Sequence, residues 1–208
     1  MKVERFIFGP FQTNTYVVSD EQHILLVDPA CYTPYEQQQL YNYINRQSIV
    51  NCQLSNRQLS IVATHGHLDH LWGAKWATET WHTPVLMHEA DIPMARAMQQ
   101  QYDLFGVRAT AEPFPMEPLN QQFSIFNFQF SIIPTPGHTP GSICLYFPNE
   151  KTLFSGDTLF QMGYGRTDLP GGNMGQLIDS LEKLFTLPSD VLVYPGHGDF
   201  TTIGAEKR

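Results

Sequence analysis

The densest group of metal-binding side chains in this sequence is the run THGHLDH (64–70), which holds three imidazoles and one carboxylate. It follows directly on the apolar run LSIVAT (59–64), which is typical of a buried strand. A helix turns about 100° per residue and would spread these groups around its circumference. An extended segment instead places His65 and His67 on one side, and Gly66 lets the backbone turn tightly. The spacing therefore predicts that His65 and His67 bind one metal ion.

Asp69 and His70 are adjacent and must diverge from that strand as the next helix begins, so they can reach a second ion. Two ions about 3.5–4 Å apart need more ligands than this run supplies. Three further candidates each follow a predicted strand: His138 in TPGHTPGS, Asp157 in FSGDT and His197 in YPGHGD. Each of them alone is equally well explained as a turn residue. Together with the first motif they predict a dinuclear metal site.

The segments that must position these ligands alternate between strands and helices. Strands are predicted at 5–9, 13–19, 23–29, 59–64, 83–88, 122–134, 142–148, 151–156 and 191–197. Helices are predicted at 34–47, 71–81, 89–105 and 174–185, and residues 106–120 are predicted to form an irregular loop. This order predicts a mixed α/β fold.

One internal repeat relates two parts of the chain. The run ILLVDP, a helix and IVATHGH resemble the later run TLFSGDT, a helix and VLVYPGHGD. Two related halves would each form a sheet backed by helices, and would stack sheet against sheet with the helices outside. Asp28 occupies the place in the first half that Asp157 occupies in the second. It is predicted to orient a metal ligand, and a turn-forming role is equally consistent with its position.

Length, charge and cysteine content narrow the class of protein. A chain of 208 residues predicts a single domain over 1–208, large enough to bury a core without a disulfide or structural metal. The formal net charge is −8 and no basic cluster precedes the last residues, which argues against a nucleic-acid partner. The three cysteines are isolated, and no run approaches the length of a membrane span. We therefore expect a cytoplasmic protein that has neither a membrane nor a nucleic-acid partner.

These motifs, in this order, resemble the metallo-β-lactamase superfamily and, within it, the hydroxyacylglutathione hydrolases or type II glyoxalases. The resemblance covers nearly the whole chain and rests on THGHLDH, GHT around His138, SGDTLF around Asp157, GRTDLPGG and PGHG around His197. It implies a four-layer αββα sandwich. The ligand sets that it implies are His65, His67 and His138 on one metal, Asp69, His70 and His197 on the other, and Asp157 bridging both.

The resemblance also implies a reaction. The cofactors would be two divalent metal ions, with zinc expected first and iron or manganese also compatible with imidazole and carboxylate ligands. Two such ions, two carboxylates and one hydroxide leave a site of about +1, which favours an anionic substrate. A metal-bound hydroxide, held and oriented by Asp69 as the catalytic residue, would attack the carbonyl of a thioester such as S-2-hydroxyacylglutathione. The thiolate would leave with little need for protonation.

The larger type II glyoxalases carry a C-terminal helical domain, which we do not expect here because only 11 residues follow His197. Glutathione contacts therefore cannot be transferred residue by residue. Tyr164 and Arg166 are candidate substrate contacts. The alternative for Arg166, which we favour, is an ion pair with Asp168 that braces their loop. The sequence does not indicate an oligomeric state.

Several other functions remain open within the superfamily. The best-known β-lactamases usually carry Cys where Asp157 stands, flavodiiron proteins tend to carry Glu where His67 stands, and the acidic balance opposes a nuclease. The nearest enzymatic alternative is an iron-dependent persulfide (sulfur) dioxygenase, which would use His65, His138 and Asp157. An interpretation from another class is a non-catalytic metal-binding module of the same fold.

Overall fold

The computed structural model describes the whole chain except residues 48, 51–52, 55–57, 120–129 and 208. The chain forms two compact units, and each is considered by itself. The first unit comprises Met1–Ala63, His67–Leu86 and Ala97–Glu117. The second comprises Thr64–Gly66, Met87–Arg96 and Pro118–Arg208. The boundaries between the units therefore fall before Thr64 and after Gly66, on either side of the tripeptide that contains His65.

The described residues form short strands and mostly short helices. The strands are β1 (Lys2–Phe8), β2 (Thr13–Ser19), β3 (His23–Val27), β4 (Ile49–Val50), β5 (Gln53–Leu54), β6 (Gln58–Val62), β7 (Val85–Met87), β8 (Met116–Pro118), β9 (Ser131–Pro134), β10 (Ile143–Phe147), β11 (Thr152–Gly156), β12 (Leu159–Phe160), β13 (Gly163–Tyr164), β14 (Leu192–Pro195) and β15 (Thr201–Thr202). The helices are α1 (Pro34–Gln47), α2 (Leu68–Leu71), α3 (Ala74–Trp81), the 3₁₀ turn η1 (Glu89–Asp91), α4 (Ile92–Arg96), α5 (Met98–Phe105), α6 (Met174–Leu184) and α7 (Ile203–Glu206).

The first unit is built on a sheet of strand order β1-β2-β3-β6-β7-β8, of which the last residues of β7 and β8 are assigned to the second unit. Strands β1, β2 and β3 form an antiparallel meander, and β3 pairs with β6 in parallel. Every residue of β2 and β3 is buried, which explains why their sequences, TNTYVVS and HILLV, are rich in β-branched and aliphatic residues.

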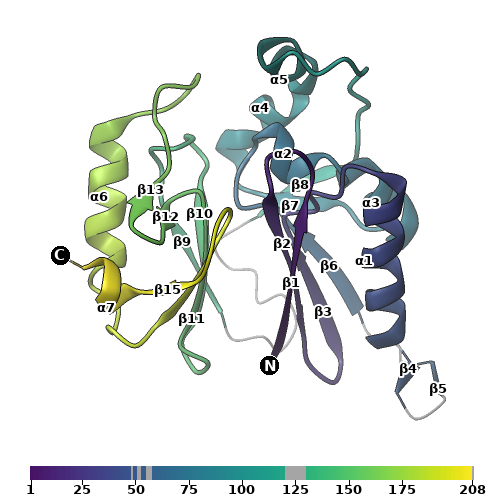
Figure 1. The fold of residues 1–208 in the computed structure, drawn as a ribbon, viewed down its shortest axis with the longest axis horizontal. Helices are drawn as coiled ribbons and strands as arrows, with labels where there is room; N and C mark the ends of the chain where they lie inside the picture. The colour runs from purple at the N-terminus through teal and green to yellow at the C-terminus, as the bar shows by residue number, and fades with distance from the viewer. Residues whose placement is uncertain (48, 51–52, 55–57, 120–129, 208) are drawn as a thin grey trace. The chain divides into compact units, whose positions relative to one another are not determined.

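Helix α1 packs along this sheet (Figure 1). Its Leu40 and Ile44 are four residues apart and fully buried, so they form the core-facing side of the helix predicted over 34–47. The Tyr43 ring contacts Phe6 of β1 edge-on, with the centroids 5.3 Å apart. Burial of this apolar face fixes the helix that connects β3 to β6.

The second unit is built on a sheet of strand order β15-β14-β11-β10-β9. Helix α6 lies along one face of it (Figure 1), where Leu184 belongs to a fully buried cluster with Cys144, Leu153 and Val193 from three of the strands. Asn173 caps the helix, since its side chain accepts a hydrogen bond from the Gln176 amide. The helix connects β11 to β14, which pair in parallel.

The predicted repeat and the mixed α/β fold class are confirmed. Each unit contains a strand, a helix and a second strand parallel to the first: β3-α1-β6 in one and β11-α6-β14 in the other. Each half of the repeat therefore has the sheet and the helix layer that the sequence predicted for it.

Three segments differ from their prediction. The helix expected over 71–81 begins earlier, at Leu68, and is interrupted before α3. The helix expected over 89–105 is divided into η1, α4 and α5, and the irregular loop expected over 106–120 contains β8. At the break before α3 the Gly73 amide donates to the Pro29 carbonyl, and next to β8 the Val85 amide donates to the Pro115 carbonyl. Local periodicity does not report such contacts with other segments. The strand expected over 122–134 is represented by β9, because residues 120–129 lie outside the described residues.

None of the helices in the described part of the chain combines the length and the apolar character that crossing a membrane requires.

Candidate metal centre

The first unit positions its ligands at the start of α2. His67 precedes the helix in an extended conformation, with φ −75° and ψ 150°, and Asp69 and His70 lie in its first turn. All three side chains are buried. The Asp69 Oδ2 atom lies 3.5 Å from His70 Nε2. The divergence of Asp69 and His70 from the strand, expected from sequence, thus results from a helix that begins between His67 and Asp69.

Asp28 fixes the orientation of His70. Its Oδ2 atom lies 2.9 Å from His70 Nδ1, and both side chains are buried. An ionised carboxylate can only accept a hydrogen bond, so Nδ1 carries the proton and the lone pair of the neutral imidazole is on Nε2. Asp28 has a positive φ of 53°, as a turn residue would. The orienting and the turn-forming roles expected from sequence therefore coexist.

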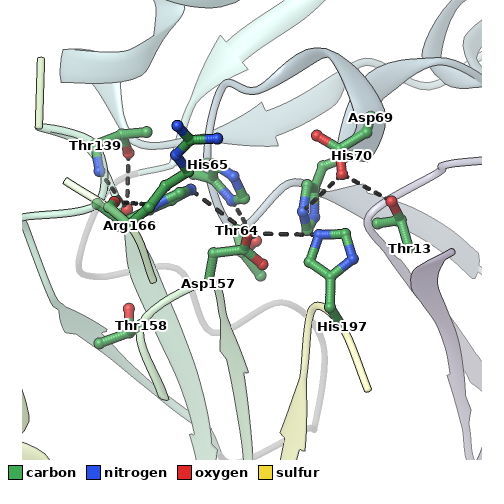
Figure 2. A network of polar contacts seen from close by, with 12 residues as sticks. Thr13, Thr64, His65, Asp69, His70, Thr139, Asp157, Thr158, Arg166 and His197 are labelled. Carbon is green, nitrogen blue, oxygen red and sulfur yellow. Dashed lines mark hydrogen bonds and ion pairs between the residues drawn. The ribbon is translucent and has the colours of Figure 1, made fainter. Parts of the chain in front are cut away.

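Thr13 is a contact of the site that the sequence did not suggest. Its Oγ1 donates a hydrogen bond of 2.7 Å to Asp69 Oδ2 (Figure 2). Thr13 is the first residue of β2 and is fully buried. Nothing local distinguishes this threonine from Thr15, so only the tertiary structure could identify it.

The second unit gathers His138, Asp157 and His197 from three loops. Asp157 Oδ2 lies 3.5 Å from His138 Nε2 and 3.5 Å from His197 Nε2. Asp157 and His197 point toward one another in Figure 2. Two ligands about 2.1 Å from one ion at a tetrahedral angle are about 3.4 Å apart. The carboxylate therefore has the spacing of an oxygen shared between two coordination spheres.

His65 belongs to the same group in the second unit. Its ring centroid lies 4.8 Å from that of His138, and it offers a ligand nitrogen within 4.8 Å of Asp157. Its Nδ1 atom lies 3.1 Å from Thr64 Oγ1. The second unit thus brings together all four of its predicted ligands.

His138 is oriented by a backbone carbonyl. Its Nδ1 lies 2.7 Å from the carbonyl oxygen of Arg166, which can only accept, so the ring donates from Nδ1 and keeps its lone pair on Nε2. The side chain of Arg166 has a different partner. It donates from Nε and Nη2 to the two carboxylate oxygens of Asp168, each at 2.6 Å. The guanidinium hydrogen bond lowers the pKa of Asp168 to about 2.

Tyr164 and Arg166, the predicted substrate contacts, are both exposed. Tyr164 lines an apolar surface pocket of about 260 Å³ together with Leu181 and Phe185, which lie on α6 and at its C-terminal end. Arg166 forms the ion pair that the sequence favoured. Contact of these two side chains with a substrate stays a prediction.

The donor set fits divalent transition metals. Imidazole nitrogens and carboxylate oxygens suit zinc, iron and manganese alike, and the two buried cysteines of the described chain, Cys31 and Cys144, are not among the ligand groups. In each unit, one imidazole is oriented through its Nδ1 atom: His70 by Asp28 and His138 by the Arg166 carbonyl. Such hydrogen bonding to the distal nitrogen is typical of metal-ligating histidines.

Comparison with known proteins identifies the family. Residues 8–197 match the family model of the metallo-beta-lactamase superfamily, and the chain belongs to that superfamily. It is 34% identical to the probable metallo-hydrolase YqgX of Bacillus subtilis, over 100% of this chain and 95% of the relative. It is also 34% identical to the hydroxyacylglutathione hydrolase GloC of Haemophilus influenzae, over 100% of this chain and 96% of the relative.

Solved structures show the same fold. TTHA1623 in a di-iron-bound form gives a TM-score of 0.85 at 32% identity, covering 99% of this chain and 97% of that one. The BLEG-1 B3 metallo-beta-lactamase gives a TM-score of 0.84 at 33% identity, covering 99% and 96%. ETHE1 from Myxococcus xanthus gives 0.71 at 27% identity, covering 100% and 82%. The fold is therefore that of the metallo-β-lactamases, and the superfamily places the protein among the metallo-hydrolases.

Proposed function

We propose that the protein is a dinuclear metal-dependent hydrolase. One divalent ion is held by His65, His67 and His138, the other by Asp69, His70 and His197, and Asp157 bridges the two. The observation that carries this proposal is the position of Asp157, whose one carboxylate oxygen lies 3.5 Å from a ring nitrogen of each of two histidines. In the proposed assignment those two histidines belong to different ions.

One glycine separates two of the proposed ligands. Their Cα atoms, those of His65 and His67, are therefore at most about 7 Å apart. We propose, as the sequence predicted, that residues 1–208 form a single functional domain.

The chemistry follows from the ligands. Two bound divalent ions would lower the pKa of a coordinated water toward about 7 and polarise a carbonyl group. The chain itself holds the acceptor that such a water needs. The Thr13 hydroxyl donates to Asp69 Oδ2 and so holds the carboxylate that we propose orients the nucleophile. Asp28 and the Arg166 carbonyl keep His70 and His138 in the tautomer that a ligand requires.

We propose a thioester as the substrate, with S-2-hydroxyacylglutathione as the example to be tested first. Support comes from the 34% identity to GloC over the full chain. A thiolate also leaves without the acid catalyst that a poorer leaving group requires. Arg166 remains a proposed substrate contact, since its carbonyl lies against His138 and brings its loop beside the ligands of the second unit. Tyr164 of the same loop is the second proposed contact.

The test combines metal analysis with a substrate panel. Purified protein is reconstituted with zinc, iron or manganese, the bound metal per chain is measured, and hydrolysis of S-lactoylglutathione is followed for the wild type and Asp69→Ala. We expect two ions per chain, zinc supporting turnover, and loss of activity in the variant. A β-lactam and glutathione persulfide complete the panel.

The panel separates the alternatives. Oxygen consumption with the persulfide and one iron per chain would assign the dioxygenase reaction instead, and β-lactam cleavage without thioester cleavage would assign a lactamase. A wild type that binds metal but is inert on the whole panel would favour the non-catalytic module. Absence of metal after reconstitution would overturn the dinuclear site itself.

A further inference from the structure

Asp91 is a fully buried carboxylate that belongs to no proposed ligand set. It ends the 3₁₀ turn η1, and both of its oxygens accept hydrogen bonds. Oδ1 accepts from the Gly141 amide at 2.6 Å. Oδ2 accepts from the Gly66 amide at 2.8 Å and from the Thr139 hydroxyl at 2.6 Å. All of these residues lie in the second unit.

The partners of Asp91 lie next to proposed metal ligands. Gly66 separates His65 from His67, and Thr139 directly follows His138. The Asp91 side chain therefore accepts hydrogen bonds from two loops. Their residues Gly66 and Thr139 are 73 positions apart in the sequence. All three of those histidines belong to the same proposed ion.

The two glycines let the loops approach the carboxylate closely. A Cβ atom on Gly66 would lie 3.0 Å from the Asp91 carbonyl oxygen, and one on Gly141 would lie 2.7 Å from the Asp91 Cγ. Any side chain at Gly141 would therefore displace the carboxylate, because real Cβ atoms do not approach so closely.

The hydrogen bonds around Asp91 have a defined direction. The carboxylate accepts from the Thr139 hydroxyl, so that hydroxyl in turn accepts from Ser142 Oγ at 2.7 Å. Ser142 Oγ then accepts from the Thr139 amide at 3.1 Å. The Gly66 amide, the Gly141 amide and the Thr139 hydroxyl all donate to Asp91, so the position requires an acceptor at both oxygens. An asparagine of the same shape would turn an NH₂ group toward at least one N–H or O–H donor.

We propose that Asp91 is a positioning residue that sets the affinity of the three-histidine metal site. It holds the His65–His67 segment and the loop after His138 in one geometry before the ion binds, so binding does not have to order two loops. This inference rests on the proposed dinuclear site. It assigns no contact between Asp91 and either the metal or the substrate.

The test measures metal binding rather than turnover. Apo protein is titrated with zinc against a chelating indicator, and the cobalt-substituted protein is examined by its visible absorption, which reports ligand geometry. Asp91→Asn is expected to weaken one of the two zinc sites by about 10- to 100-fold, to leave the other within a few-fold, and to alter the cobalt spectrum. Circular dichroism and the thermal midpoint of the apo protein verify folding.

Two further variants keep the test decisive. Thr139→Val removes one of the three donors and is expected to weaken the same site by a smaller factor, and it decides the question if Asp91→Asn does not fold. Asp20→Asn is the matched control, because Asp20 accepts from the Gln22 and His23 amides in a turn of the first unit. It is expected to bind both ions as the wild type does.

The possible results test the Asp91 role and the dinuclear site separately. Unchanged zinc affinities and cobalt spectra in Asp91→Asn and Thr139→Val would overturn the positioning role, as would an equal loss at both sites. A wild type that binds neither ion would instead overturn the proposed function, so the two failures are distinguishable.

Discussion

The two halves of the internal repeat use equivalent carboxylates in different ways. In the first half Asp28 directly follows β3 and itself has a positive φ, of 53°, and its carboxylate lies on the Nδ1 atom of His70. In the second half Gly156, the last residue of β11, has the positive φ, of 49°. Asp157 comes one residue later, with its carboxylate near the Nε2 atoms of His138 and His197.

A displacement of one residue thus separates an aspartate that contacts a proposed ligand from an aspartate that we propose as a ligand. In the second half, Gly156 takes the left-handed conformation at little cost. The Asp157 side chain that follows it lies next to His138 and His197. In the first half the aspartate takes that conformation itself, which short polar residues tolerate. A repeat in sequence therefore does not imply a repeat in function.

The largest effect is expected at Asp157. Asp157→Asn keeps the shape but removes the charge that the two proposed ions would share, so we expect fewer than two ions per chain and a loss of hydrolytic activity of about a thousandfold or more. Metal analysis and initial rates measure both. Asp190→Asn, at an exposed ion pair with Lys151, is the control and should match the wild type. Two ions retained in Asp157→Asn would refute the bridging position.

A smaller effect is expected at Asp28. Asp28→Gly suits the positive φ but removes the acceptor of the His70 proton, so we expect zinc affinity to fall by about 10- to 100-fold at one site. Asp28→Asn keeps an acceptor oxygen and should lose about tenfold or less. Zinc titration of the two variants side by side measures the difference. Equal and severe loss in both, matching Asp157→Asn, would mean that Asp28 also acts as a ligand.

A stability effect is expected at Gly156. The Cβ atom of Gly156→Ala would lie 2.5 Å from Thr64 Oγ1, and its φ of 49° is unfavourable for alanine. We expect the free energy of unfolding to fall by about 1–3 kcal/mol. Urea unfolding of the apo protein measures this. Asp28→Asn should unfold close to the wild type, because asparagine tolerates the same backbone region. Equal stability of Gly156→Ala and the wild type would show that the second half can relax around this turn.

The smallest effect is expected for the reactivity of the two buried cysteine thiols. One of these cysteines lies in each unit, so their alkylation rates can be compared. Burial raises the pKa of Cys31 in the first unit to about 12 and that of Cys144 in the second to about 11. At pH 8 we therefore expect almost no thiolate and no alkylation of either residue in the native protein. Mass spectrometry of a Cys52→Ser variant after iodoacetamide treatment measures each site. Cys52 is replaced because it lies outside the described residues.

An alkylation rate that rises tenfold per pH unit at both Cys31 and Cys144 would agree with this prediction, because the thiolate fraction rises by that factor below the pKa. Rapid labelling of one cysteine at pH 8 would contradict it, and would show that the unit containing that residue opens locally more often than its counterpart.

The sequence by itself determined the mixed α/β class, the repeat and the candidate ligands. This was possible because THGHLDH is contiguous, and because each of the other candidates directly follows a predicted strand. The ends of α2 could not be read in this way, since the Leu68 amide donates to the Gln101 side chain and the Gly73 amide to the Pro29 carbonyl, both distant in sequence. The division of 89–105 into three helices has no local signal in the sequence.

The sequence predicted an orienting role for Asp28 without its partner, and only the tertiary structure showed which residue each supporting group contacts. Thr13 lies 56 residues from Asp69, Asp28 lies 42 residues from His70, and Asp91 lies 48 residues from Thr139. A hydroxyl or carboxylate in a strand or turn carries no local sign of its partner, because the hydrogen bond depends on the folded path between them. The residue types therefore indicated which metals the proposed site could bind, and the fold determined which neighbouring groups hold the proposed ligands in place.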